Sequence, residues 1–278
     1  MIKNVVVISD THFGCKLALM PDEFITDEGT IIKPSELQKK LLLMWNDFWG
    51  EFVPRATRNE EFILVHNGDI IDGIHHNSVT QITQNIADQR KMAIQMMRPI
   101  LDNPKCRAYY HIRGTEAHVG KSGQDEEDIA RQLNAIPNAE NNYARWELWL
   151  RFGDKGLLTH FTHHISTTNS AAYESTAVYK EYIEACVDSA RWGYEPPDAV
   201  IRSHRHRHFK IEIASKNTNA ISVVTPGWQL KTPFVFRGSL GRSSTPQIGG
   251  IILREGEEVP IYERAKVWNI QRPEEERL

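Results

Sequence analysis

The stretch Val5-Val6-Val7-Ile8-Ser9-Asp10-Thr11-His12-Phe13-Gly14 is a hydrophobic run that ends in polar residues. Its unbroken β-branched part predicts a strand that is buried on both faces, as at the centre of a parallel sheet. If the backbone stays extended, Asp10 and His12 point to the same side, because alternate residues of a strand share a face. A carboxylate oxygen and an imidazole nitrogen placed in this way can bind one cation. The hypothesis of a metal site then requires later strands to end in the same manner.

Length and composition are those of an ordinary globular chain. The 278 residues suit one large α/β domain or two small ones. The hydrophobic share of 40% and the charged share of 25% are typical of a soluble protein. The cysteines, Cys15, Cys106 and Cys186, form no CxxC pair. The sequence therefore predicts neither a zinc knuckle nor a disulfide framework.

Charge and hydropathy bear on the partners and on the compartment. A formal net charge of -3 provides no overall attraction to nucleic acid, although a local basic groove would not show in that sum. No basic leader followed by an apolar run opens the chain, and no stretch of about 18 apolar residues occurs. We therefore expect a cytoplasmic protein without a membrane partner. The sequence does not indicate its oligomeric state.

The next two predicted strands also end in potential metal ligands. Residues 61–65 form an apolar run that leads to Asp69 and Asp72, and residues 106–112 lead to Glu116 and His118. Amphipathic helices are predicted between the strands, over about 35–49 with Ser35 as the N-cap, and over about 79–101. Ligands bind at the carboxyl edge of such alternating α/β sheets.

The second half of the chain changes to adjacent strands. The turn chemistry at 153–156 predicts a hairpin of strands 145–152 and 157–162, which is followed by His163. The strand at 198–202 leads to His204 and His206. The remaining elements expected here are helices at about 125–133 and 171–192 and short strands at 220–224, 234–237 and 249–253.

The predicted architecture is α/β, with two packed mixed β-sheets flanked by helices. We expect a single domain over 1–278, in which 209–278 complete the second sheet. Trp228 is expected to be a packing residue, and His75 and His76 an exposed loop pair. The charged segment 272–277 is expected to be a solvated tail.

Carboxylates and imidazoles therefore collect at the strand ends. The residues are Asp10, His12, Asp69, Asp72, Glu116, His118, His163, His204 and His206. Such ligands without thiolates suit Mn, Fe, Ni or Zn, and there are enough of them for two ions. A single histidine at one strand end would more often be a packing or surface residue, but five separate segments with ligand chemistry favour a metal site.

The chain resembles the calcineurin-like metallophosphoesterase superfamily. Asp10-Thr11-His12-Phe13-Gly14 matches its Asp-x-His-x-Gly motif, and Gly68-Asp69-Ile70-Ile71-Asp72 matches Gly-Asp-x-x-Asp. Ser203-His204-Arg205-His206 matches Gly-His-x-His, with serine in place of glycine. The motifs follow the family's order over about residues 1–210. The resemblance implies an αββα sandwich and a dinuclear centre of divalent transition-metal ions, with manganese preferred.

The resemblance also implies a distribution of ligands. It puts Asp10, His12 and His206 on one ion and His163 and His204 on the other, with Asp69 bridging. His163 is favoured because it matches the family's Thr-His step, whereas His160 and His164 are rivals near the same strand end.

The third motif departs from the family. The family has Gly-Asn-His followed by an acid, whereas this chain has Gly114-Thr115-Glu116-Ala117-His118. One interpretation keeps Glu116 as a metal ligand in place of asparagine and uses His118 as the catalytic histidine, oriented by Asp72. In the other interpretation, the loop has lost its ligand and the activity is weak or absent.

The expected function is hydrolysis of phosphate esters by a metal-activated hydroxide. Phosphodiesters, such as DNA or nucleotides, are favoured because Ser9-Asp10-Thr11-His12-Phe13-Gly14 looks like the opening of the superfamily's DNA-repair nucleases. The alternatives are a phosphomonoesterase, including a protein phosphatase, and a catalytically silent metal-binding scaffold.

Overall fold

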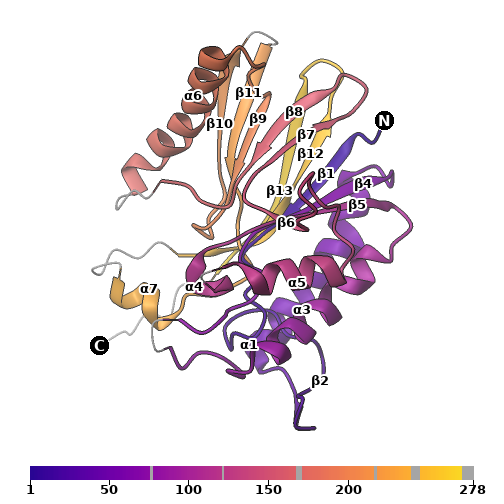
Figure 1. The fold of residues 1–278 in the computed structure, drawn as a ribbon, viewed down its shortest axis with the longest axis vertical. Helices are drawn as coiled ribbons and strands as arrows, with labels where there is room; N and C mark the ends of the chain where they lie inside the picture. The colour runs from indigo at the N-terminus through magenta and orange to yellow at the C-terminus, as the bar shows by residue number, and fades with distance from the viewer. Residues whose placement is uncertain (76–77, 121, 167–170, 216–217, 239–244, 271–278) are drawn as a thin grey trace, which may run out of the picture.

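Two mixed β-sheets lie at the centre of the structure, and helices cover the outer face of each (Figure 1). The structure is a computed structural model that describes residues 1–278 except 76–77, 121, 167–170, 216–217, 239–244 and 271–278. The layers follow the order helices, first sheet, second sheet, helix. This arrangement confirms the predicted α/β class with two packed sheets.

The first sheet has the strand order β13-β12-β1-β4-β5-β6. Neighbouring strands from β1 to β6 run parallel, whereas β12 runs antiparallel to β1 and to β13. The strands are β1 (Asn4–Ile8), β4 (Phe62–Asn67), β5 (Cys106–Ile112), β6 (Ala144–Arg145), β12 (Gln247–Glu255) and β13 (Ile261–Asn269).

The second sheet has the strand order β10-β11-β9-β8-β7. Its centre is parallel, because β9 pairs in parallel with β8 and β11, and an antiparallel strand closes each edge. The strands are β7 (Leu148–Phe152), β8 (Leu157–Phe161), β9 (Ala199–Arg202), β10 (Phe209–Ser215) and β11 (Thr218–Val224). The predicted hairpin is the antiparallel pair β7–β8.

The surroundings of β1 explain why its sequence does not alternate between apolar and polar residues. Val6 and Ile8 pack into the core beneath the helices, whereas Val5 and Val7 pack between the two sheets. Each of these side chains is fully buried. A strand with apolar partners on both faces needs apolar residues at every position.

The helices belong to two outer layers. Against the first sheet lie α1 (Glu36–Asp47), η1 (Phe48–Phe52), α2 (Val53–Ala56), α3 (Ile86–Leu101) and α5 (Gln124–Gln132), and α6 (Glu174–Trp192) covers the second sheet. The shorter elements are β2 (Phe24–Ile25), β3 (Ile31–Ile32), α4 (Glu116–Val119), η2 (Ala171–Tyr173) and α7 (Pro233–Gly238). The N-cap predicted at Ser35 is confirmed, since Ser35 and Gln38 form a reciprocal capping box.

The last part of the chain departs from the prediction. Strands β10 and β11 belong to the second sheet, but β12 and β13 extend the first, so 209–278 do not all complete the second sheet. The reason is that Ile251, Ile252 and Leu253 are fully buried beside β1, where both faces are covered. The strand expected at 234–237 is also wrong, because these residues lie in α7.

Two further predictions concern packing and membranes. Trp228 is fully buried and its ring meets Trp45 edge-on at 4.8 Å between centroids, which confirms its packing role. Among the described residues, no helix combines the length and apolarity needed to cross a bilayer. His76 and the charged segment 272–277 lie outside the described residues.

Candidate metal centre

The loops that follow β1, β4, β8 and β9 bring their polar side chains to one place between the two sheets. The loops after β1 and β4 continue to exchange hydrogen bonds beyond the strands, since the N–H groups of Asp10 and His12 donate to the carbonyls of Gly68 and Asp69 at 2.9 and 3.1 Å. The first sheet provides Asp10, His12 and Asp69, and the second provides His163, His204 and His206.

One cluster consists of Asp10, His12 and His206. His206 Nε2 lies 3.2 Å from Asp10 Oδ1 and 3.2 Å from His12 Nε2. Asp10 and His12 are almost fully buried. A carboxylate oxygen and two imidazole nitrogens that converge in this way are a ligand set suited to a divalent transition-metal ion.

The second cluster consists of Asp69, His163 and His204. His163 Nε2 lies 3.1 Å from Asp69 Oδ2 and 3.9 Å from Asp10 Oδ1. Asp69 also groups with His12 and His118, all three with ligand-type atoms within 4.8 Å of one another. The two clusters are therefore contiguous, and Asp10 and Asp69 lie where the clusters adjoin.

A hydrogen bond orients His163, and a carboxylate lies near the ring of His12. His163 Nδ1 donates to the Asn67 carbonyl at 2.7 Å, which leaves Nε2 unprotonated in the neutral ring and directed at Asp69. His12 Nδ1 lies 3.7 Å from Asp72 Oδ1, while its Nε2 faces His206. Metal-binding histidines commonly have their second nitrogen held by a carbonyl or a carboxylate in this manner.

The pKa values show how strongly the carboxylates and imidazoles interact. Burial acts to raise the pKa of Asp10, but the charges of His206 and His163 outweigh it, so the carboxyl stays ionised. Burial acts to lower the pKa of His163, but Asp69 and Asp10 raise it to about 10. Burial, with His118 and His206, lowers the pKa of His12 to about 3. Without a cation, the negative charge of the site retains a proton, which a metal ion would displace.

The backbone at the site is strained. Asp10, His12, Asp69, His204 and His206 have φ values of 52°, 43°, 55°, 72° and 52°. Left-handed backbone is uncommon for residues with a Cβ and costs about 1–3 kcal/mol at a strained position. The surrounding hydrogen bonds thus hold five potential ligands in a conformation that the isolated chain would avoid.

The loop after β5 differs from the expectation for Glu116. Glu116 is exposed in the first turn of α4 and belongs to none of the ligand clusters among the described residues. Thr115, one residue earlier, donates from its N–H to Asp69 Oδ1 at 2.7 Å and from its hydroxyl at 3.1 Å. Sequence reasoning missed Thr115, although it occupies the asparagine position of the family motif.

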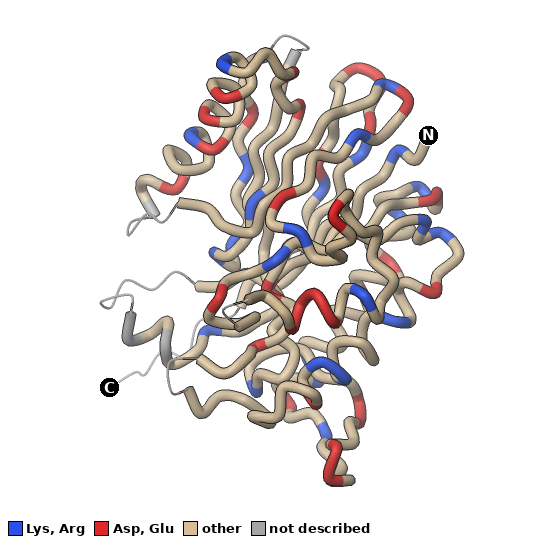
Figure 2. Tube along the Cα trace, in the orientation of Figure 1, with Lys and Arg blue, Asp and Glu red and all other residues tan. Residues whose placement is uncertain are grey.

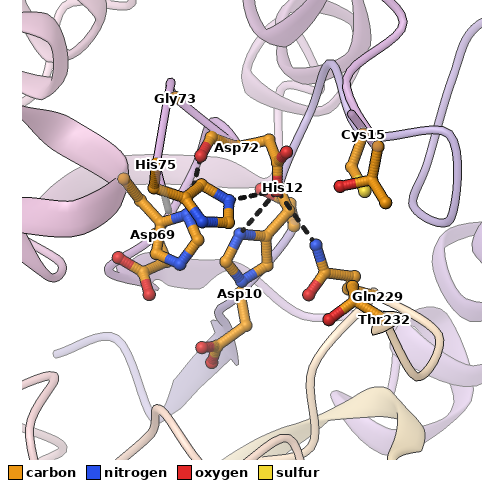
Figure 3. Close-up of polar contacts among 12 residues, drawn as sticks. Asp10, His12, Cys15, Asp69, Asp72, Gly73, His75, Gln229 and Thr232 are labelled. Carbon is orange, nitrogen blue, oxygen red and sulfur yellow. Dashed lines mark hydrogen bonds and ion pairs between the residues drawn. The ribbon is translucent and has the colours of Figure 1, made fainter. Parts of the chain in front are cut away.

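His118 does reach the site, but Asp72 holds it differently than expected. The His118 ring meets the His12 ring edge-on at 4.4 Å, and its Nδ1 donates to the Asp72 carbonyl at 2.7 Å. The Asp72 carboxylate instead accepts a hydrogen bond from Gln81 at 2.8 Å. It also accepts one from Gln229 at 3.1 Å and lies near His12 (Figure 3). Asp72 therefore touches His118 through its main chain and His12 through its side chain.

His75 is less exposed than the sequence predicts, since only 9% of its side chain is accessible. Figure 3 shows its ring turned toward Asp72, with Nε2 3.6 Å from Asp72 Oδ1. The ring also meets that of His118 at 4.4 Å. The chain departs from extended structure after Asp72, and this turn brings His75 back to the site.

The three histidines near the end of β8 have different surroundings. His163 lies in the second cluster. His160 points away, stacks on Trp149 at 4.1 Å and faces Glu147. The exposed His164 lies 5.7 Å from the His204 ring. The alternation of β8 explains this difference, because Phe161 faces the inter-sheet core and His160 faces outward.

Comparisons with known proteins add little to this description. No known family's sequence profile matches the chain. No curated protein sequence matches it either. Solved structures that do match include Vps29 of Chaetomium thermophilum, with 10% identity, a TM-score of 0.38, and coverage of 98% of this chain and 99% of that one. A predicted phosphoesterase of Streptococcus pneumoniae has 9% identity, a TM-score of 0.35, and coverage of 96% and 98%. A Thermotoga maritima protein solved by NMR has 8% identity, a TM-score of 0.34, and coverage of 97% and 100%.

Proposed function

We propose that this chain is a dinuclear metal-dependent phosphoesterase that hydrolyses phosphodiesters. The main support is the pair of contiguous clusters, in which buried carboxylates lie close to imidazoles. Asp10 Oδ1 and His163 Nε2 are buried and lack a hydrogen-bond partner in the described structure. Buried polar atoms are rarely left in this state, so a bound cation is a physical reason for their arrangement.

The described residues fit two ions. Asp10, His12 and His206 would hold one, and His163 and His204 the other, with Asp69 between them. The absence of thiolates favours manganese, iron, nickel or zinc, and we propose manganese. When bound, such ions supply Lewis acidity that lowers the pKa of water from about 15.7 to about 7 and neutralises phosphoryl oxygens.

His118 is proposed to hold the proton for the leaving oxygen. Its Nδ1 donates to the Asp72 carbonyl, so its Nε2 is the nitrogen that can gain or lose a proton. General acid catalysis of this kind contributes about 10² to 10⁴ in rate. Asp72 orients His12 through its carboxylate and His118 through its carbonyl.

Nucleotides or nucleic acid are the proposed class of phosphodiester. The support is the resemblance of Ser9-Asp10-Thr11-His12-Phe13-Gly14 to the opening motif of DNA-repair nucleases. The charges are interspersed along the trace, and α6 for example carries both signs (Figure 2). Binding to a polyanion would therefore depend on local groups at the site rather than on the overall field.

The test compares two esters after the metal has been removed and Mn²⁺ restored. The unsubstituted protein is expected to hydrolyse bis-p-nitrophenyl phosphate faster than p-nitrophenyl phosphate, and only with Mn²⁺. Asp69→Asn is expected to abolish the turnover and to weaken Mn²⁺ binding. A preference for the monoester would favour a phosphomonoesterase. Bound Mn²⁺ without turnover of either ester would favour the silent scaffold, to which the altered loop at 114–118 also points.

A further inference from the structure

We propose that Glu126, a buried glutamate on α5, is a positioning residue for the metal centre. This inference rests on the proposed function. Glu126 is fully buried and lies outside the ligand clusters. Its two carboxylate oxygens accept hydrogen bonds from two different loops of the site, the loop after β4 that carries Asp69 and the loop after β5 that carries Thr115. The residue thereby sets the position of Asp69, which lies between the two clusters.

The first contact is to the loop after β4. Glu126 Oε1 accepts the N–H of Ile70 at 3.2 Å, directly after Asp69. The carbonyl of Ile70 accepts the N–H of Phe13 at 2.9 Å and the hydroxyl of Thr11 at 3.0 Å. The peptides on both sides of Ile70 therefore connect Glu126 to the loop that carries Asp10 and His12.

The second contact is to the loop after β5. Glu126 Oε2 accepts the N–H of Gly114 at 2.6 Å. The next residue, Thr115, donates from both its N–H and its hydroxyl to the Asp69 carboxylate. One buried carboxylate thus holds the main chain of Asp69 and, through Gly114, the group that orients its side chain. Hydrogen bonds to an ionised acceptor are about twice as strong as neutral ones.

Two side chains from β5 lie next to Glu126. The hydroxyl of Tyr109 lies 2.6 Å from His111 Nδ1, and His111 Nε2 lies 3.5 Å from Glu126 Oε1. Burial raises the pKa of Tyr109 well above its usual value, so the phenol keeps its proton beside Nδ1. His111 Nε2 is buried without a hydrogen-bond partner of its own, so it packs beside the carboxylate and does not bond to it.

Glu127 provides a matched control on the same helix. It is also nearly buried, with 6% exposed, and accepts the N–H groups of Tyr143 and Ala144 at 2.9 and 2.8 Å. These residues carry no ligand of the clusters. Glutamine at either position keeps the shape of the side chain, but its amide offers one acceptor oxygen in place of two. Both substitutions should lower the thermal midpoint.

The experiment measures Mn²⁺ binding to the metal-free full chain by calorimetry. Glu126→Gln is expected to weaken binding about 10- to 100-fold, in the range seen when groups that orient metal ligands are lost. Glu127→Gln is expected to stay within about twofold of the unsubstituted protein. Saturating Mn²⁺ should restore the turnover of Glu126→Gln. If Glu126→Gln does not fold, Glu126→Asp, which keeps the charge, is measured in the same way.

The outcomes separate the two proposals. Unchanged Mn²⁺ affinity in the folded Glu126 variant overturns the positioning role and leaves the metal-dependent function intact. Equal losses in the Glu126 and Glu127 variants also overturn it, because general destabilisation would then explain both. If the unsubstituted protein binds no Mn²⁺, the proposed function itself fails and the positioning role fails with it.

Discussion

At the scale of single residues, the site depends on the close approach of Gly114 to Asp69 as well as on the potential ligands. A Cβ added to Gly114 would collide with the main-chain nitrogen and the carboxylate of Asp69. The contact between Thr115 and Asp69 therefore requires a glycine beside it. The same loop provides the N–H that Glu126 accepts. A methyl group at this position should disturb both contacts.

Gly114→Ala is accordingly expected to lower the free energy of unfolding by about 1–3 kcal/mol, as overpacking does, and to weaken Mn²⁺ binding at least tenfold. Urea titration and calorimetry measure the two effects. Gly50→Ala is the control, because a methyl group at Gly50 would meet no atom within 4 Å and its backbone is helical. Comparable Mn²⁺ affinity in the two variants would contradict the role of Gly114.

His118→Gln tests the proton that is assigned to this imidazole. Turnover of esters with a poor leaving group is expected to fall about 10²- to 10⁴-fold, because an alkoxide needs a proton to depart. p-Nitrophenyl esters should be affected much less, since p-nitrophenolate leaves as an anion. Steady-state rates over a series of leaving groups measure this difference. A loss of bound Mn²⁺ would instead make His118 a ligand, as its grouping with His12 and Asp69 allows.

At the scale of elements, the hairpin β12–β13 is the partner that β1 needs on one side. Residues 4–7 of β1 pair with residues 251–254 of β12. Ile251 packs between the sheets, and Ile252 packs under the helices. Without this hairpin, β1 would become an exposed edge with unpaired main-chain groups.

A chain ending at residue 246 is therefore expected to lose cooperative thermal unfolding. A chain ending at residue 270 keeps every described strand and should unfold cooperatively. Circular dichroism against temperature distinguishes the two. A cooperative transition in the shorter chain would show that β12 and β13 are dispensable for the first sheet.

The outer face of β7 and β8 holds a histidine whose charge is unfavourable. Burial, together with the charge of Arg202, lowers the pKa of His160 from 6.5 to about 3. Between these values the unfolded chain binds the proton and the folded protein does not. Stability is therefore full above about pH 6.5 and is lost as the pH falls toward 3.

His160→Gln is expected to flatten this dependence. In EDTA, the free energy of unfolding of the unsubstituted protein should fall more steeply from pH 6.5 to 4.5 than that of the variant. The difference in slope should approach, at most, about 1.4 kcal/mol per pH unit. Urea titrations at a series of pH values measure it. Parallel curves for the two proteins would contradict the depressed pKa.

At the scale of the whole molecule, the candidate metal centre joins the two sheets. Asp10, His12 and Asp69 follow strands of the first sheet, whereas His163, His204 and His206 follow strands of the second. An ion bound here has ligands on both sides of the inter-sheet core. Only the folded chain brings these ligands together, so metal binding should be coupled to the stability of the entire fold.

Mn²⁺ is therefore expected to stabilise the protein and EDTA to reverse the effect. At 100 times its dissociation constant, an ion adds about 2.7 kcal/mol to the free energy of unfolding for each site. Thermal melts over a series of Mn²⁺ concentrations measure the increase. Asp69→Asn should show a smaller one. A melting temperature that does not respond to Mn²⁺ in the unsubstituted protein would contradict the centre.

Much of the fold was predictable because the relevant signals are local. The β-branched run of β1, the Ser35 cap of α1 and the turn between β7 and β8 each arise from neighbouring residues, and each agrees with the structure. Strand β5 occupies the predicted range, Cys106–Ile112. Short-range sterics and hydrogen bonding determine such elements, so their residues carry the information directly.

The arrangement of the candidate site was predictable only in part. The motifs placed Asp10, His12, Asp69 and His206 just after strands. The extended backbone expected at Asp10 and His12 is wrong, because both residues have left-handed φ values. The Thr-His step favoured His163 over His160 from the sequence, and the face of β8 that packs on the other sheet gives the physical reason. That face depends on distant residues, which no local pattern describes.

The remaining features depend on contacts between segments far apart in the chain. Three of them are seen only in the folded protein. Thr115, rather than Glu116, contacts Asp69, and His75 returns to Asp72. Glu126 is buried between two loops. The pairing of β12 with β1 in the first sheet also depends on contacts between distant segments. Side-chain chemistry and strand periodicity follow from the residues themselves, whereas these contacts arise when the packing of two sheets and their helices selects which loops meet.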